Sequence, residues 1–215
     1  MAKIEVNNLT KVIHKNTVLE DISLSMESGS IYGFQGVNGS GKTMLMRAII
    51  GLIRPTKGSI SINGKILGKD LEFPESIGFL LENPAFLDGY SGLDNLRMLS
   101  KVQGNLPDEV LEQWLLRVGL ADAGKKKYKK YSLGMKQRLG IAAAVMEEPD
   151  IVILDEPSNA LDTAGVDMLN ELIIEQKERG ALVILSCHDT DMLIRLSDVI
   201  FKLENGKLIK TEGDK

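Results

Sequence analysis

The stretch "GVNGSGKT", residues 36–43, matches the phosphate-binding pattern G-x-x-x-x-G-K-[ST] at every fixed position. It follows a strand-like segment, "IYGFQ", and precedes a helix-like one, which is the context that such a loop needs. Glycines let the backbone curl so that successive N–H groups face a phosphate. Lys42 can then reach the β- and γ-phosphates, and Thr43 can offer its hydroxyl to Mg²⁺. The residues expected to hold the nucleotide here are Gly36, Asn38, Gly39, Ser40, Gly41, Lys42 and Thr43.

A second motif, the acidic stretch "IVILDEP" at residues 151–157, completes a phosphate site. An acidic residue at the end of a buried strand is costly unless a cation or a donor meets it. Asp155 is therefore expected to hold Mg²⁺ through its water shell, as in phosphoryl-transfer sites. Glu156 is free to act as the base or to orient the attacking water.

Residues around these two motifs show the patterns of an α/β protein. From Lys42 to Leu52 the apolar period is helical, with Leu45, Ile49 and Leu52 on one stripe. The runs "DIVILDEP" and "GALVILSCH" lack alternation, which suits buried strands of a parallel sheet. The helix expected between them, at 166–179, has Glu175 and Arg179 spaced for an i,i+4 pair.

The two ends of the chain indicate antiparallel strands. Residues 1–35 read as short strands, and "SISINGKIL" turns at Asn63-Gly64, as the tail does at Asn205-Gly206. Residues 85–130 are mostly helical in pattern. We expect one domain over 1–215, with an N-terminal antiparallel β subdomain, a parallel core and a helical insertion at about 85–145.

Composition restricts the partners. Hydrophobic residues make up 43% of 215, and the formal net charge of −4 disfavours nucleic acid. The lysine-rich run at 125–130 is a solvated loop or a patch for anions or lipid headgroups. The single cysteine, Cys187, excludes a disulfide framework and favours the cytosol. The start lacks a signal-peptide core and apolar runs fall short of the ~18 residues that span a bilayer, so we expect any membrane role to depend on another chain.

The stretch "YSLGMKQRLG", residues 131–140, opens a helix without an anion to meet its free N–H groups. Ser132 and Gly134 precede the good helix formers that run from Met135 to Val145. A helix start carries partial positive charge and unpaired amide donors, so it commonly binds an anion. Nothing adjacent in the chain supplies one.

The order of these motifs resembles that of the ATP-binding subunit of an ABC transporter, over essentially the whole chain. The phosphate loop at 36–43 is followed by a glutamine-type loop near 82, a signature at 131–137, "ILDEP", "SNALD" and a histidine in "SCH". The resemblance implies a P-loop NTPase (RecA-like) core and an ATPase that uses ATP and Mg²⁺. It also implies a head-to-tail dimer and an integral membrane permease subunit, with the chain peripheral on the inner face of the cell membrane.

The resemblance also assigns roles to residues. Ser132 and Gly134 would face the γ-phosphate held by the other subunit, which answers why the helix start lacks its own anion. His188 would contact the γ-phosphate and, with Glu156 and Lys42, carry out hydrolysis. Asp162 would lie in the loop that crosses the dimer seam.

Three positions depart from the family pattern. The usual signature L-S-G-G-Q is Tyr-Ser-Leu-Gly-Met here, so the contacts of the family's glutamine cannot be transferred. Glu82 stands where the family has glutamine; it could ligate Mg²⁺, orient water, or be an ordinary acidic loop residue. Ile13 occupies the place of the aromatic residue that stacks on adenine, and His14 could stack instead. Glu82 and the signature resemble the subgroup that exports lantibiotics, bacitracin-like peptides and related drugs.

Other functions remain as alternatives. A soluble ABC ATPase without transport, acting in a macromolecular assembly, usually has paired cassettes or long coiled-coil insertions, for which this chain has no room. A module that binds ATP without turnover does not need Lys42, Asp155, Glu156 and His188 together. A small-molecule P-loop kinase explains neither the signature nor "SCH".

Overall fold

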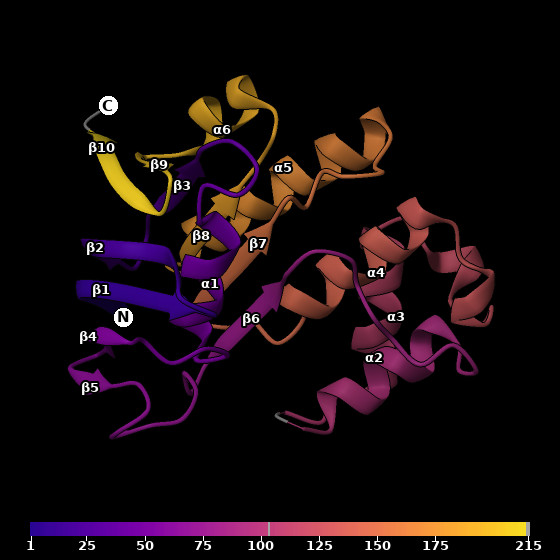
Figure 1. Ribbon diagram of the computed structural model, residues 1–215. Coiled ribbons are helices and arrows are strands. Elements are labelled where there is room, and N and C mark those ends of the chain that lie inside the picture. The colour runs from indigo at the N-terminus through magenta and orange to yellow at the C-terminus, as the bar shows by residue number, and fades with distance from the viewer. Residues whose placement is uncertain (103, 214–215) are drawn as a thin grey trace.

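The computed structural model describes residues 1–102 and 104–213, and its centre is a six-stranded sheet with the order β10-β9-β3-β8-β7-β6 (Figure 1). β3, β8, β7 and β6 are parallel, β9 is parallel to β3, and β10 is antiparallel to β9. Its strands are β3 (Ile31–Gln35), β6 (Ile77–Leu80), β7 (Ile151–Asp155), β8 (Leu182–Ser186), β9 (Val199–Glu204) and β10 (Lys207–Gly213). Every residue of β7 and β8 is buried, as their unbroken apolar runs predict.

A smaller antiparallel sheet, in the order β2-β1-β4-β5, covers one face of the central sheet. It consists of β1 (Lys3–Ile13), β2 (Asn16–Glu27), β4 (Lys57–Ile62) and β5 (Lys65–Ile66). Apolar side chains of this sheet form one core with helix α1 (Lys42–Ile50) and with Ile151, Ile153 and Ile184 of the central sheet. The predicted antiparallel subdomain and parallel core are both confirmed.

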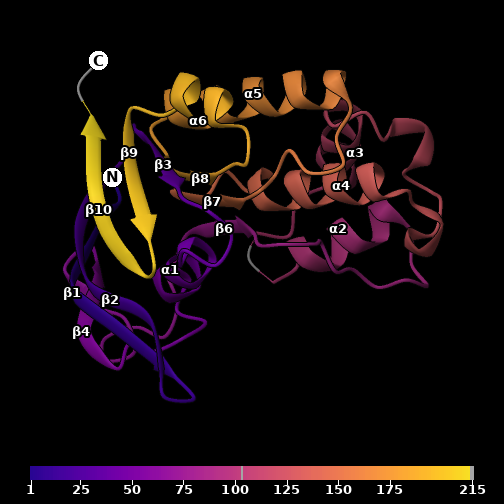
Figure 2. The ribbon, with the colours of Figure 1, turned by 45° about the horizontal axis from the view of Figure 1, so that its top comes forward.

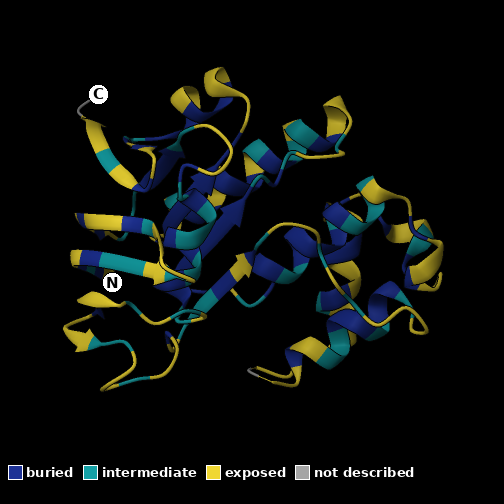
Figure 3. Ribbon diagram, in the orientation of Figure 1, coloured by how far each residue is buried: buried dark blue, intermediate teal, exposed yellow. Residues whose placement is uncertain are grey.

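The opposite face of the central sheet carries two helices. α5 (Thr163–Glu178) and α6 (Thr190–Leu196) lie above it in Figure 2, where α1 and the small sheet lie below. Val152, Leu154, Val183 and Leu185 point to this second core. Because side chains alternate along a strand, β7 and β8 serve both cores at once, and their strands are dark blue in Figure 3.

The helical region lies to one side of the sheets (Figures 1 and 2). It comprises α2 (Gly92–Ser100), α3 (Asp108–Arg117), two 3₁₀ turns (Ala121–Ala123 and Tyr128–Lys130) and α4 (Leu133–Val145). Leu111, Trp114 and Leu115 of α3 are buried in the core that α4 shares with α5 and α6. Cys187 is packed in that same core.

Two local predictions were wrong. α1 ends at the left-handed Gly51, so Leu52 lies beyond the helix and is exposed instead of continuing the stripe. Glu175 pairs with Arg117, not Arg179, whose guanidinium donates to the carbonyls of Glu148 and Pro149. The start of α4 agrees with the prediction, because Ser132 caps a helix whose first residue is Leu133.

Candidate functional site

The phosphate loop joins β3 to α1 and is shaped by glycines. Gly41 has a φ of 109° and directly precedes α1, a backbone geometry that favours glycine. A Cβ at Gly36 would lie 2.4 Å from the carbonyl oxygen of Leu203, so a side chain has no room there. The helix start has no side-chain cap, which leaves the amides of its first turn available for a ligand.

Lys42 lies inside the loop that it belongs to. Its Nζ donates to the carbonyl oxygen of Gly36 at 2.7 Å and to that of Val37 at 3.4 Å. The residue is only 6% exposed and no carboxylate pairs with it in the described structure. A buried ammonium held only by carbonyl oxygens is suited to receive an anion.

Three oxygen-bearing side chains meet at the mouth of the loop. Thr43 Oγ1 donates to Asp155 Oδ2 at 2.5 Å, and Ser186 Oγ donates to the other oxygen of Asp155. Asp155 is buried at the carboxyl end of β7, next to Ser186 at the end of β8. Parallel strands therefore bring Thr43, Asp155 and Ser186 to one edge of the sheet.

Glu156 follows Asp155 in a strained backbone conformation, with a φ of 51°. Its amide donates to Ser186 Oγ at 3.0 Å, and its carboxylate accepts the amide of His188 at 2.8 Å. His188 Nε2 lies 3.6 Å from the other carboxylate oxygen. Burial raises the pKa of Glu156, an effect that His188 and Lys42 reduce and Asp155 reinforces. A raised pKa is typical of a carboxylate that accepts and returns protons.

A pocket of about 540 Å³ lies at this edge of the sheet. Eight of the predicted residues line it: Asn38, Gly39, Ser40, Gly41, Lys42, Thr43, Asp155 and Glu156. The sequence did not predict Thr17 and Val18 from β2 or the turn residues Asn205 and Gly206, which also line it. The turn is held there because the Gly206 amide donates to the Ser40 carbonyl at 2.9 Å. No sequence signal marks either hairpin as a wall of the phosphate pocket.

Other predicted site residues do not line this pocket. Gly36, the first residue of the loop, instead lines a neighbouring hollow of about 490 Å³ together with His188. Ile13 is half-buried at the end of the β1–β2 hairpin, opposite Asn16. Glu82 is exposed and forms an ion pair with Arg47 of α1 at 2.8 Å. Glutamate here therefore has a partner cation within the chain.

The signature residues belong to the start of α4. Ser132 Oγ accepts the amide of Met135 at 3.2 Å, which makes it the N-cap. Ser132 and Leu133 are exposed, and Leu133 is 72% exposed despite its apolar side chain. Asp162, also exposed, caps α5 by accepting the Gly165 amide and pairs with Arg138 of α4 at 2.6 Å. Arg138, which sequence reasoning missed, holds the pKa of Asp162 below its usual range.

The fold and the pocket define a P-loop NTPase with an antiparallel β subdomain and a helical region. Residues 19–159 match the family model described as ABC transporter. The chain belongs to this family as an ATP-binding subunit, and it is an ABC-type ATPase.

Similar curated proteins carry the same family name. The chain is 47% identical over 97% of its length to an ABC transporter ATP-binding protein, YybJ, of Bacillus subtilis (strain 168), covering 96% of that protein. It is 37% identical to the bacitracin transport ATP-binding protein BcrA of Enterococcus faecalis, over 96% of this chain and 68% of that one. It is 34% identical to the lantibiotic transport ATP-binding protein SrtF of Streptococcus pyogenes, over 96% and 89%.

Solved structures share the fold. An ATP-binding subunit of an ABC transporter, 30% identical, superposes with a TM-score of 0.89 over 98% of this chain and 89% of that chain. A dimeric ATP-binding cassette bound to ADP and Pi, 24% identical, has a TM-score of 0.88 over 98% of both chains. No helix among the residues that the structure describes is long and apolar enough to cross a membrane.

Proposed function

We propose that this ATPase powers a separate membrane-spanning subunit that exports peptide antibiotics or related drugs, and that it works as a head-to-tail dimer on the inner face of the membrane. The observation that carries the ATPase mechanism is the position of Glu156, whose carboxylate lies beside Asp155 and His188 at the phosphate pocket. Residues that bind the phosphates, residues that neutralise their charge and a residue that accepts a proton thus meet at one edge of the sheet.

Hydrolysis requires water to attack the γ-phosphate while charge builds up on its oxygens. Glu156 accepts the water's proton, and His188, held against the same carboxylate, keeps the water in place. Lys42 and the amides at the start of α1 neutralise the phosphate oxygens. The two oxygen donors of Thr43 and Asp155 are of the kind that Mg²⁺ prefers, so the site fits this ion, which would supply further positive charge.

The exposed start of α4 supports the proposed dimer. Ser132 and Gly134 do not line the phosphate pocket of their own chain, and α4 lies in the helical region, away from α1 (Figures 1 and 2). An exposed helix start with a serine cap is a ready anion site. A second subunit would bring its nucleotide there, so that each ATP is held by the loop of one chain and the signature of the other.

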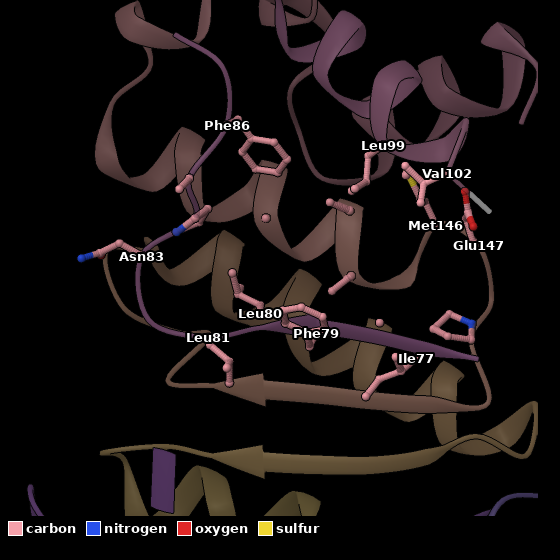
Figure 4. Close-up of a pocket in the computed structure, with 17 residues that line it drawn as sticks. Ile77, Phe79, Leu80, Leu81, Asn83, Phe86, Leu99, Val102, Met146 and Glu147 are labelled. Atoms are coloured by element: carbon pink, nitrogen blue, oxygen red, sulfur yellow. The ribbon is translucent and has the colours of Figure 1, made fainter. Parts of the chain in front are cut away.

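The membrane subunit docks, in this proposal, in an apolar groove of about 420 Å³ between β6 and the helical region (Figure 4). Phe79, Leu99 and Val102 are exposed there, an arrangement typical of an interaction site. Glu147 is the only charged side chain that lines the groove within the described residues, and its Oε1 is buried without a hydrogen-bond partner among them. The occupant that fits is a short amphipathic helix with one basic residue.

The cargo is inferred from relatives. Proteins named for bacitracin transport and lantibiotic transport are 37% and 34% identical to this chain over nearly all of its length. Replacing the native gene with one that encodes Glu156→Gln should lower the minimal inhibitory concentration of such peptides for the host. Unchanged sensitivity to both classes would reject them as cargo and leave the ATPase proposal intact.

The test of the mechanism is Glu156→Gln. We expect ATP binding to persist, turnover to fall by at least about 100-fold, and an ATP-bound dimer to accumulate on a sizing column. The control is Glu112→Gln on the exposed face of α3, which should leave all three measurements unchanged. Turnover at the parental rate would mean that Glu156 is not the catalytic carboxylate.

The test of the groove is Val102→Asp, which places a negative charge beside the apolar groove and Glu147. We expect loss of ATP-driven transport in vesicles that contain both subunits, with the basal ATPase of the isolated chain unchanged. Leu116→Asp, at an exposed leucine on α3 outside the groove, is the matched control. Equal transport by both variants would contradict docking in the groove.

A further inference from the structure

The segment from Glu156 to Asp162 runs along the first turns of α4, with two side-chain hydrogen bonds and one close backbone approach between them. Gln137 Nε2 donates to the carbonyl oxygen of Pro157 at 2.9 Å. Arg138 pairs with Asp162 at 2.6 Å, and a Cβ on Gly134 would lie 2.7 Å from the carbonyl oxygen of Ala160. The helix that presents the signature is therefore bound directly to the segment that carries the catalytic carboxylate.

Gln137 makes the contact nearest to Glu156. Its side chain is only 4% exposed, and its amide also lies 3.5 Å from the carbonyl oxygen of Glu156 itself. On the other side, the amide of Glu156 is held by Ser186 at the end of β8. Glu156 has a positive φ, which persists only where the surroundings impose it. β8 and Gln137 thus hold its two backbone polar groups from opposite sides.

We propose that Gln137 is a positioning residue that couples the start of α4 to Glu156 of the same chain. This inference rests on the proposed function, because the anion at the start of α4 is the nucleotide of the other subunit. Ser132 and Gly134 contact that nucleotide one turn before Gln137 on the same rigid helix. Binding at one site of the dimer thereby sets the backbone that carries the general base of the other site.

The coupling is specific because it acts within one chain. A loss of Gln137 leaves the exposed Ser132 and its cap in place, since the cap is formed with Met135. It also leaves Lys42, Thr43 and the phosphate loop untouched, because none of them contacts Gln137 in the hydrogen bonds described. The expected defect is therefore in turnover by the chain's own Glu156, not in nucleotide binding.

The experiment uses Gln137→Met, which has nearly the same shape but no amide donor. In the full-length protein with ATP and Mg²⁺ we expect kcat to fall by about 10- to 100-fold, the effect of misplacing a reacting group by a fraction of an ångström. KM for ATP should stay within about twofold of the parent. Gln113→Met, at an exposed glutamine on α3, is the matched control and should change neither value.

Mixed dimers separate positioning from a general structural role. When one protomer carries Glu156→Gln, both loops still bind ATP but only the intact protomer's Glu156 can turn it over. Gln137→Met should abolish most turnover when it is in the intact protomer and should have little effect in the Glu156→Gln protomer. The opposite pattern, or equal loss in both arrangements, would overturn the proposal, as would unchanged kcat.

A second variant protects the test against misfolding. Gln137→Asn keeps a buried amide but withdraws it by one methylene, so it should fold and show a smaller fall in kcat with the same dependence on the protomer. If the Met variant melts early, the Asn variant decides, and an unchanged kcat would reject the proposal. Absence of ATP-dependent dimers in the parental protein would refute the proposed function instead, which is a distinct result.

Discussion

Two helices of this molecule, α1 and α4, begin at phosphate-binding motifs, but their starts have opposite surroundings. α1 follows the left-handed Gly41, has no side-chain cap, and places Lys42 in the interior of its loop. α4 is capped by its own Ser132 and exposes Leu133. Both leave amide donors unpaired, as every helix start does.

The difference lies in the walls. Hairpin residues Thr17 and Asn205, together with Asp155 and Glu156, surround the start of α1, so one chain forms several walls of that pocket. Ser132 is exposed and does not line this pocket. The comparison teaches that a helix start alone does not make a site; the walls decide whether one chain suffices.

The largest effect that tests this comparison is Lys42→Ala. Removing the buried ammonium should weaken ATP binding by at least about 100-fold in calorimetry, since charged hydrogen bonds to phosphate are lost. Lys136→Ala, in the first turn of α4, removes a lysine that lies over the Tyr128 ring and should leave binding to the isolated chain unchanged. Equal loss in both variants would remove the distinction between the two helix starts.

The next effect concerns the half-site. In a mixed dimer where only one site can bind ATP, Ser132→Arg in the opposite protomer should lower turnover by at least about tenfold, because it fills the phosphate position across the interface. The same change in the protomer that holds the ATP should be tolerated. Ser91→Arg, at the N-cap of α2, is the control for loss of a serine cap. Loss that follows the protomer with the loop would refute action across the interface.

A smaller effect concerns the pH dependence of stability. Burial raises the pKa of Glu156, so the charged form destabilises the folded state above that pKa and the cost disappears below the ordinary glutamate pKa. Glu156→Gln should therefore raise the Tm at pH 7, on the order of 2–4 °C for each kcal/mol gained, and the gain should vanish as the pH falls. Calorimetric scans across pH measure this. A gain that is independent of pH would contradict the assigned cause.

The smallest effect concerns the ties between α4 and its neighbours. Arg138→Ala leaves the carbonyl of Val118 and the carboxylate of Asp162 without their partner, and should lower the free energy of unfolding by about 1–3 kcal/mol. Arg117→Ala removes the exposed pair with Glu175 and the contact of the guanidinium with the Trp114 ring, and should cost about 1 kcal/mol. Denaturant titration of both variants measures the two free energies of unfolding. A larger cost for Arg117 would mean that the helical region is held to α5 mainly through α3 instead.

The sequence predicted the phosphate loop, the paired strands and the two hairpins because each has a local pattern. Lys42 and Thr43 are fixed by a spacing, and β7 and β8 by unbroken apolar runs. The boundary of the helical insertion stays a prediction. The roles of Ile13 and Glu82 in the site also stay predictions, since neither residue lines the phosphate pocket.

What could not be predicted comes from contacts distant in the chain. The ion pair of Glu82 with Arg47 and the bond from Gln137 to Pro157 join residues on separate elements. Leu52 fitted the helical period, but Gly51 adopted a left-handed conformation that ended the helix first. No sequence period contains such information, because these outcomes depend on which surfaces the fold brings together.

The bond from the Gly206 amide to the Ser40 carbonyl also has a consequence for synthesis on the ribosome. The phosphate loop emerges early in translation, but Asn205 and Gly206, which form one side of its pocket, emerge much later. A nascent chain can therefore curl its loop without being able to retain a nucleotide. Products truncated before Asn205 would lack this side of the pocket, and we expect them to hold ATP less tightly than finished chains do.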